Sequence, residues 1–262
     1  GTADRVRGFS RETVSGYMKD RYLASKMVLS ASGAVEHDEL VAHAEACFSD
    51  LPIDGATDME AASYTGGEYR EERDLEQVHF ALSVPGLSYQ DDDFYAVQIL
   101  SGLLGGGMSS RLFQEVREKR GLCYSVFSFS SSFADSGLFT VYAGTGEQQI
   151  GELGQVICDE LIRVTENITE DELSRAKAQH KAGLLMGQEN PAARCEVHAR
   201  QLLIYDRVIS TSEITQKIES VTPAQLTSLA SRLFCGTQPS LAALGPIKNL
   251  DPFDRFAARF AG

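Results

Sequence analysis

Residues 105–146 read GGGMSSRLFQEVREKRGLCYSVFSFSSSFADSGLFTVYAGTG, and this stretch decides the fold class. A run of glycines comes first, and Ser109 or Ser110 can then cap a short helix. Its apolar residues recur at helical spacing: Leu112, Phe113 and Val116. Basic residues fall in the last turn, where the helix dipole favours cations, and Gly121 follows as a C′ glycine. The pattern predicts an amphipathic helix that ends at Gly121.

A β-hairpin is predicted directly after this helix. The segment ADSG supplies turn residues, and the return strand LFTVYAG is rich in β-branched and aromatic residues. Three aromatic residues alternate on one face of the first strand: Phe127, Phe129 and Phe133. The opposite face carries serines: Ser128, Ser130 and Ser132. We expect this serine-rich face to contact water or an extended ligand.

The flanking sequence indicates further strands and helices. Alternating apolar residues predict strands at VHFALSV (78–84) and SLAALG (240–245). Helical spacing covers residues 94–104 and 150–164. Capping patterns begin two more helices, at Thr169 with Glu172 and at Thr222 with Pro223. Because a hairpin is present and no regular βαβ series occurs, we expect an α/β (α+β) fold, with helices packed on a mixed, largely antiparallel sheet.

The N-terminal part predicts a separate and incomplete unit. Three elements are expected: a helix over Ser10–Tyr22, a strand over Lys26–Ser32, and a helix over Glu36–Phe48 with Leu40, Ala44 and Cys47 or Phe48 facing inward. From Asp54 to Gly67 the periodicity is lost and small and polar residues gather, which is typical of a linker. We therefore expect two domains, at residues 1–66 and 67–262.

The histidines and cysteines do not predict a metal site in this segment. His37 and His43 are six residues apart on a predicted helix, so they point to different sides of it. The cysteines form no C-x-x-C pair. Cys123 precedes Tyr124, but no histidine partner is indicated for it. We interpret Cys123 as a small buried residue.

Composition narrows the function classes. The chain has 262 residues and a net charge of −13, which disfavours nucleic acid, whose phosphates require a basic surface. An acidic surface either keeps the protein soluble or suits basic peptides. No apolar run approaches the ~18 residues that a membrane span needs, so no membrane association is expected. An odd number of scattered cysteines fits a reducing compartment.

The stretch around REKRGLCYS resembles the second homologous domain of the pitrilysin-type (inverzincin) zinc peptidases. It is most similar to the branch that includes the mitochondrial processing peptidase and its bacterial relatives. Arg117 and Tyr124, seven residues apart, match a pair that in this family reaches towards the zinc site in the other half of the molecule. Residues 1–52 also look like the closing segment of the family's first domain. The resemblance therefore covers the whole chain and implies a duplicated α/β fold.

The resemblance also implies where the zinc ligands lie. The family binds zinc through H-x-x-E-H and a later Glu, with the motif's own Glu as general base. No H-x-x-E-H occurs in this chain, so we expect it to be the C-terminal part of a longer polypeptide whose zinc ligands lie outside it. Residues 1–66 would then be the closing segment of the zinc-type domain plus a linker, and 67–262 the second domain. No zinc is expected in this segment.

The resemblance also implies roles for two groups of residues. Arg117 and Tyr124 would be catalytic, because a guanidinium or phenol can stabilise the oxyanion that develops on a peptide carbonyl. The glycine run, Gly105, Gly106 and Gly107, lacks the spacing of a phosphate loop. Two interpretations of it remain open: a helix breaker that needs positive φ, or a loop that contacts substrate.

Two functions fit these expectations. The intact protein is either a zinc metalloendopeptidase that cleaves extended peptides or presequences, or a non-catalytic partner subunit that binds peptide and supplies Arg117 and Tyr124 to a zinc-bearing companion. By itself this segment should be inactive. The resemblance implies peptide substrates, a homodimer or a heterodimer with a related subunit, and a location in the bacterial cytoplasm or the mitochondrial matrix. The sequence of the cleaved peptide is left open.

Overall fold

The computed structural model describes residues 1–53 and 60–261, which form two compact units. Unit 1 comprises Gly1–Ala61 and Leu185–Ser210, and unit 2 comprises Ala62–Leu184 and Thr211–Gly262. The predicted linker over 54–67 lies partly outside the described residues. The division falls close to the predicted boundary after residue 66, but it adds Leu185–Ser210 to the N-terminal unit, which the sequence did not indicate.

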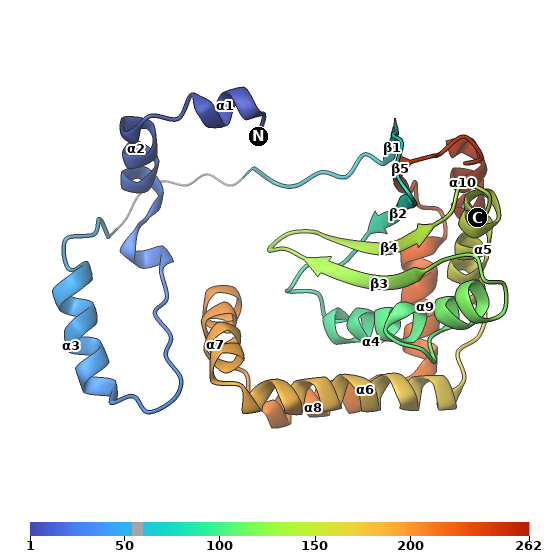
Figure 1. The fold of residues 1–262 in the computed structure, drawn as a ribbon. Coiled ribbons are helices and arrows are strands. Elements are labelled where there is room, and N and C mark those ends of the chain that lie inside the picture. The colour runs from blue at the N-terminus through green and yellow to red at the C-terminus, as the bar shows by residue number, and fades with distance from the viewer. Residues whose placement is uncertain (54–59, 262) are drawn as a thin grey trace. The chain divides into compact units, whose positions relative to one another are not determined.

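Unit 2 is built on one five-stranded sheet in the order β1-β5-β2-β4-β3 (Figure 1). The strands are β1 (Gly67–Glu72), β2 (Val78–Pro85), β3 (Ser125–Ser132), β4 (Gly137–Thr145) and β5 (Ser240–Gly245). Only β1 and β5 run parallel, and the other neighbours are antiparallel. The predicted mixed, largely antiparallel sheet is therefore confirmed.

Helices pack on one face of this sheet because its residues alternate between apolar and polar. In β2, Val78, Phe80, Leu82 and Val84 are buried, and the residues between them are only half-buried. Phe80 contacts Phe256 of the last helix at 6.0 Å between ring centroids, and Phe139 of β4 meets Phe234 edge to face at 5.3 Å. The helices of unit 2 are α4 (Phe94–Gly105), the π-helix η2 (Phe113–Glu118), α5 (Ile150–Arg163), α6 (Glu170–Glu189), α8 (Thr211–Ser220), α9 (Pro223–Phe234) and α10 (Phe253–Phe260), with the end of α6 in unit 1.

Both predicted capping patterns are present. At the start of α6, Thr169 N donates to Glu172 Oε2 at 3.0 Å, and Glu172 N donates to Thr169 Oγ1 at 3.3 Å. At the start of α9, Gln225 N donates to Thr222 Oγ1 at 3.2 Å and Pro223 occupies the first turn. Side-chain oxygens thus satisfy amide groups that a helix start leaves without partners.

The predicted orientation of the β3–β4 hairpin is wrong. Ser128 and Ser132 are buried, whereas Phe127 and Phe129 are 43% and 41% exposed. Helix α4 lies so close to β3 that only small side chains fit between them, and Ser128 Oγ donates to the carbonyl oxygen of Ser101 at 2.8 Å. The Phe127 ring instead contacts Tyr142 on the other face of the sheet, with centroids 4.9 Å apart. Close packing of a helix therefore reversed the faces that hydrophobicity alone predicts.

Unit 1 consists of helices: α1 (Ala3–Arg7), α2 (Arg11–Arg21), the 3₁₀ turn η1 (Ala24–Lys26), α3 (His37–Phe48) and α7 (Pro191–Tyr205). The helices predicted over Ser10–Tyr22 and Glu36–Phe48 are confirmed, and Ser10 Oγ caps α2 by accepting from Thr13 N at 3.2 Å. The strand predicted over 26–32 is wrong, because the described part of unit 1 contains no strand that could pair with it. The predicted inward face of α3 is confirmed only in part: Leu40 and Ala44 are half-buried and the rest of the helix, with Cys47 and Phe48, is exposed.

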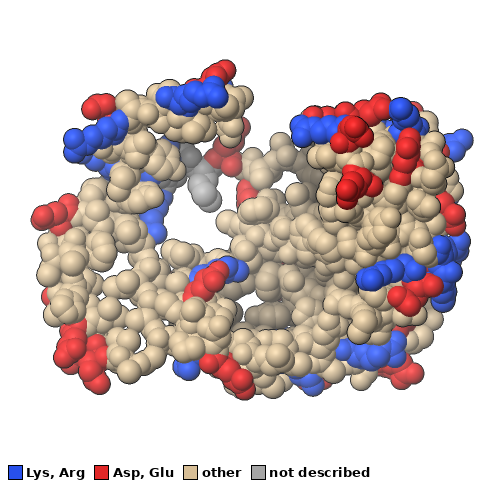
Figure 2. Space-filling view, in the orientation of Figure 1, with Lys and Arg blue, Asp and Glu red and all other residues tan. Residues whose placement is uncertain are grey.

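The charged residues of the chain are mixed rather than separated by sign on the face drawn in Figure 2, where basic and acidic side chains lie next to one another. Ion pairs of unit 2 show the same mixing. Arg255 lies 2.8 Å from Asp251, and Arg232 lies 3.2 Å from Asp93. No basic patch is visible on this face of the described residues.

Candidate functional site

The helix predicted after the glycine run has an unexpected form. Arg111 and Leu112 begin it as an α-turn, and residues Phe113–Glu118 continue it as the π-helix η2. Lys119 N donates to the carbonyl oxygen of Gln114 at 3.0 Å, which is the i to i−5 bond of a π-helix. Such segments are rare and occur frequently at functional sites. The sequence pattern predicted the helix but could not distinguish the two forms.

The predicted serine cap is not present at the start of this helix. The carbonyl oxygen of Ser110 accepts from Gln114 N at 3.0 Å, but the Ser110 side chain is buried and Oγ finds no partner among the described residues. The Ser110 hydroxyl does not cap the helix because it points into the interior. In the part of the chain that the structure describes, no side-chain hydrogen bond from Ser109 caps the helix either.

The end of the helix is as predicted. Gly121 has φ of 63°, a left-handed conformation that glycine adopts without strain, and its N–H donates to the carbonyl oxygen of Arg117 at 3.0 Å. Leu122 N then donates to the carbonyl oxygen of Val116 at 2.9 Å. Two residues later, Tyr124 N donates to Gly144 O at 2.9 Å, which joins the chain to β4. The backbone between Arg117 and Tyr124 is therefore held at both ends.

Arg117 and Tyr124 both present their side chains to solvent. The guanidinium carbon of Arg117 lies 4.8 Å from the centroid of the Phe113 ring, which is a cation–π distance. Tyr124 is 69% exposed. Within the described residues, neither side chain makes a hydrogen bond or ion pair. Both residues thus offer hydrogen-bond donors from a fixed backbone.

Cys123 lies between these two residues and is half-buried. Burial raises the pKa of its thiol to about 11, and the nearby positive charge of Arg117 opposes that shift without reversing it. The thiol is therefore protonated at neutral pH, and a thiol rather than a thiolate is a poor nucleophile. This supports the interpretation of Cys123 as a structural residue. It also shows that Arg117 is close enough to influence the Cys123 sulfur.

The three glycines of the turn have different environments. Helix α4 ends at Gly105, as a helix breaker predicts, but none of the three glycines has the positive φ that was expected. Gly105 is buried, and a Cβ there would collide with the backbone nitrogen of Ser128 in β3. Gly106 is exposed and Gly107 is half-buried. Gly105 is needed for the close approach of α4 to β3, whereas Gly106 and Gly107 lie at the surface.

Gly106 borders a cavity of about 620 Å³ in unit 2, a volume typical of ligand pockets. The walls come from α4, β3, α6 and α8, and are largely apolar: Phe94, Tyr95, Ile99, Phe129, Leu184, Ile214 and Ile218. His180 also lines it, and its Nε2 lies 2.7 Å from the carbonyl oxygen of Gln98. Burial lowers the pKa of His180, so the imidazole is neutral at pH 7. This cavity was not predicted from the sequence.

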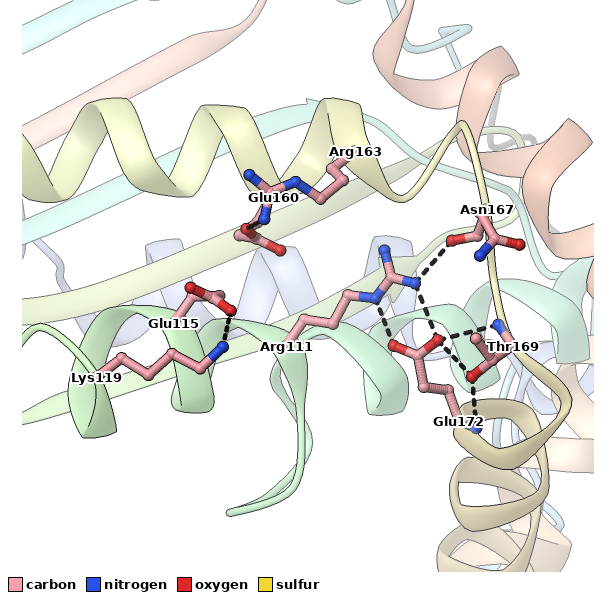
Figure 3. Close-up of polar contacts among 8 residues, drawn as sticks. All are labelled: Arg111, Glu115, Lys119, Glu160, Arg163, Asn167, Thr169 and Glu172. Atoms are coloured by element: carbon pink, nitrogen blue, oxygen red, sulfur yellow. Dashed lines mark hydrogen bonds and ion pairs between the residues drawn. The ribbon is translucent and has the colours of Figure 1, made fainter.

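Behind η2 lies a network of charged side chains (Figure 3). Arg111 forms a two-pronged ion pair with Glu172: Nε lies 2.6 Å from Oε1, and Nη2 lies 3.0 Å from Oε2. Nη2 also donates to the carbonyl oxygen of Asn167 at 2.7 Å. The capping pattern predicted a role for Glu172 at the start of α6, but sequence reasoning missed Arg111 because its partner is 61 residues away.

Two further ion pairs belong to the same network. Glu115 pairs with Lys119 within the helical turn of η2. Glu160 of α5 is 3% exposed and accepts from Arg163 Nη1 at 2.6 Å. Burial raises the pKa of Glu160 even though Arg163 and other cations favour its charged form. These contacts surround the back of η2 with fixed charges.

The residues described do not fit a catalytic zinc site. Among residues 1–53 and 60–261, no group of three or more His, Cys, Asp or Glu side chains could hold a metal ion. Three or four such ligands are required for zinc.

No helix within the same ranges is long and apolar enough to cross a membrane.

A family model described as "Peptidase M16 inactive domain" matches residues 8–180. The chain belongs to this family. An M16 relative from Rickettsia bellii, named as an uncharacterized zinc protease, is 35% identical over 97% of this chain and 61% of its own length. A probable mitochondrial-processing peptidase subunit beta from Arabidopsis thaliana is 31% identical over 99% of this chain and 51% of its own length. The resemblance to the pitrilysin-type zinc peptidases is thereby confirmed.

The M16 fold is supported by solved structures. A chain of the Candida albicans complex III2 structure with Inz-5 bound superposes with a TM-score of 0.86 at 22% identity, over 99% of this chain and 64% of that chain. The present chain thus spans about 61% and 51% of the two relatives and 64% of the structural neighbour. The remaining part of each of those proteins is not matched by this chain.

Proposed function

We propose that this chain is the C-terminal part of a zinc metalloendopeptidase that cleaves peptides or presequences. In this proposal it contributes substrate binding and transition-state stabilisation, and zinc is held elsewhere in the longer polypeptide. The observation that carries the proposal is that Arg117 and Tyr124 project into solvent from a backbone anchored at Gly121 and Gly144. The names of the M16 relatives, zinc protease and processing peptidase, support the same reaction class.

The chemistry of the two side chains suits peptide hydrolysis. Negative charge develops on the carbonyl oxygen when a peptide bond is attacked, and pre-positioned donors stabilise it. The Arg117 guanidinium offers a fixed positive charge with several N–H donors, and the Tyr124 hydroxyl offers a neutral O–H donor. Neither group needs to move far, because the connecting backbone is held by hydrogen bonds at both ends. We propose that one stabilises the oxyanion while the other holds a neighbouring carbonyl.

Substrate contact by the glycine turn is part of the proposal. Gly106 and Gly107 are at the surface, and an extended peptide could approach their backbone closely because they lack side chains. Gly105 is buried against Ser128, so its contribution is to set the position of the turn. The exposed side chain of Met108 follows directly and offers an adaptable apolar contact.

The domain assignment extends this proposal to the whole chain. Residues 1–66 would be the closing segment of the zinc-type domain plus the linker, and 67–262 the second domain. Unit 1 supports this, because many of its apolar side chains are exposed, as expected for a segment that packs on a sheet from elsewhere. We also propose that the protein forms a homodimer or a heterodimer with a related subunit. We propose a location in the bacterial cytoplasm or the mitochondrial matrix, since the relatives include bacterial proteins and a mitochondrial subunit.

A second function is favoured by two comparisons. One relative is named as a subunit beta, and one structural neighbour is a chain of complex III2. In this alternative the longer protein lacks zinc and supplies Arg117, Tyr124 and a peptide-binding surface to a companion subunit. The geometry of η2 and β3 suits both alternatives, since the donors are the same.

Zinc analysis and mutagenesis of the full-length polypeptide test the proposal. We expect about one zinc per chain, and Arg117→Ala and Tyr124→Phe should each lower kcat by about 10²-fold with little change in KM. Arg120→Ala and Tyr69→Phe are the controls, because both residues are exposed in unit 2 and contact nearby acidic side chains, Arg120 that of Glu152 at 3.2 Å and Tyr69 that of Glu71 at 2.8 Å. Absence of zinc with retained peptide binding would favour the partner subunit. Unchanged kcat in both variants would contradict either role for the pair.

A further inference from the structure

The π-helix that carries Arg117 is attached at its start to a different helix. Arg111, the first residue of that helical turn, pairs with Glu172 of α6 through two parallel hydrogen bonds of 2.6 and 3.0 Å. The two side chains are only 14% and 20% exposed. Two-pronged Arg–carboxylate pairs fix orientation as well as distance. The ion pair therefore fixes the orientation of the start of η2 relative to α6 as well as their separation.

Glu172 is itself held rigidly. Its Oε2 accepts from Thr169 N at 3.0 Å and from Thr169 Oγ1 at 2.8 Å, in addition to Arg111 Nη2. Burial alone would raise the pKa of Glu172, but the hydrogen bonds from Arg111 and Thr169 outweigh it and lower the pKa to about 2. The carboxylate is charged throughout the physiological range. Arg111 is thus bound to a permanent and immobile acceptor (Figure 3).

The other end of the same turn is also fixed, at Gly121 and Leu122. Between these two attachments the chain forms a π-helix, in which the direction of each side chain differs from that in an α-helix of the same length. In an α-helical turn of the same residues, the Arg117 side chain would point in a different direction. In the π-helical form its guanidinium carbon lies 4.8 Å from the centroid of the Phe113 ring.

We propose that Arg111 and Glu172 are positioning residues, whose ion pair holds the π-helical form of η2 and so directs the Arg117 guanidinium towards the peptide. The inference rests on the proposed function only in the last step, the contact of Arg117 with peptide. The effect of the ion pair on the orientation of the Arg117 side chain involves residues of unit 2 alone. It can be measured in this chain without a substrate.

Two substitutions separate this role from simple stabilisation. Glu172→Gln keeps a residue that can complete the capping box with Thr169, but it removes the charge that binds Arg111. Arg111→Lys keeps the charge but cannot form two parallel hydrogen bonds. Glu219→Gln is the matched control, because Glu219 pairs with Lys181 of the same helix α6 and makes no contact with η2.

The first experiment is heteronuclear NMR on this chain. We expect Glu172→Gln and Arg111→Lys to shift the side-chain Nε–H signal of Arg117 and the amide signal of Gly121, and Glu219→Gln to leave both unchanged. If Glu172→Gln does not fold, Arg111→Lys alone decides the question. Unchanged Arg117 and Gly121 signals in a folded variant would overturn the inference, as would equal shifts in the Glu219→Gln control.

The second experiment is a double-mutant cycle on peptide cleavage by the full-length polypeptide. We expect Glu172→Gln to lower kcat by roughly 10-fold with KM little changed, because small displacements of a catalytic group are costly. In an Arg117→Ala background the same change should lower kcat less than about 2-fold. Equal effects in both backgrounds would show a role independent of Arg117. If Arg117→Ala leaves kcat unchanged, the proposed function fails, while the NMR result still decides whether the ion pair positions Arg117.

Discussion

Units 1 and 2 differ in how completely their helices bury apolar residues. In unit 2 the aromatic core residues Phe80, Phe139 and Phe234 are essentially inaccessible. Among the described residues of unit 1, only Leu23 and Ile209 are buried apolar residues, and helices α2, α3 and α7 contain no buried residue. Large exposed side chains of unit 1 include Val6, Phe9, Tyr17, Phe48, Met186 and Leu203.

Apolar side chains are covered in the unit whose helices have a sheet to pack on. Unit 2 carries five strands, and its helices α4, α5 and α9 pack on them. No strand is found in the described part of unit 1, so its helices have only one another to pack against. Exposed apolar area of this kind marks a contact surface. The predictions below test this contrast, from the largest expected effect to the smallest.

The first prediction compares two phenylalanines. Phe80→Ala, in the core of unit 2, should lower the free energy of unfolding by about 3–5 kcal/mol, because it removes a buried ring and leaves a cavity. Phe9→Ala, at a site that is 61% exposed in unit 1, should change it by less than about 0.5 kcal/mol. Urea unfolding followed by circular dichroism measures both. Similar losses for the two variants would show that unit 1 has a core of its own.

The second prediction concerns pH. The pKa of Glu172 is lowered from 4.5 to about 2, so its ion pair stabilises the fold above pH 4.5 and this stabilisation is lost as the pH falls from 4.5 towards 2. This lowering of the pKa corresponds to about 3–4 kcal/mol at most. Glu172→Gln should therefore be less stable than the parent protein at pH 7, and the gap should narrow below pH 4. Glu76→Gln, at an exposed carboxylate in the loop before β2, is the control and should show a far smaller pH-dependent gap. A constant gap between pH 7 and pH 3 for Glu172→Gln would contradict the assignment.

The third prediction compares two glycines. Gly105→Ala should destabilise unit 2 by about 1–3 kcal/mol, because the new Cβ collides with the Ser128 nitrogen and forces α4 away from β3. Gly16→Ala, in the middle of α2, meets no atom within 4 Å and should stabilise its helix by about 0.5–1 kcal/mol. Thermal unfolding of both variants measures the difference in sign. A neutral Gly105→Ala would mean that the packing of α4 on β3 can relax.

The fourth prediction concerns thiol alkylation. Cys158 is buried in unit 2, and burial raises the pKa of its thiol to about 12, so it should react with iodoacetamide only when unit 2 unfolds. Cys47 is exposed in unit 1 and should react in the native protein. Mass spectrometry of peptides after timed alkylation gives both rates. Rapid reaction of Cys158 at pH 7 would show that the core of unit 2 opens readily.

Much of unit 2 could be predicted from the sequence. Alternation in VHFALSV and helical spacing after Phe94 identified β2 and α4, because these periods depend only on which face is buried. Capping by Thr169 and Thr222 and the turn at Gly121 were also recognised, since each involves residues only a few positions apart. Arg117 and Tyr124 were found by resemblance to a known family, and their catalytic role remains a prediction.

The features that sequence reasoning missed all depend on distant residues. The serines of β3 were expected to face water, but the close approach of α4 at Gly105 buries them. The strand predicted over 26–32 has no partner in the described part of unit 1, since a strand is stable only when another strand satisfies its backbone. The π-helical form of η2 and the pairing of Arg111 with Glu172 were likewise invisible.

By itself, the sequence determined the local elements, the caps, the mixed sheet and the family to which the chain belongs. Only the tertiary structure decided which face of the hairpin is buried, which helical form carries Arg117, and which carboxylate pairs with Arg111. The physical reason is range: periodicity and capping act over a few residues, whereas burial and ion pairing are set by segments far apart in the chain, such as Arg111 and Glu172.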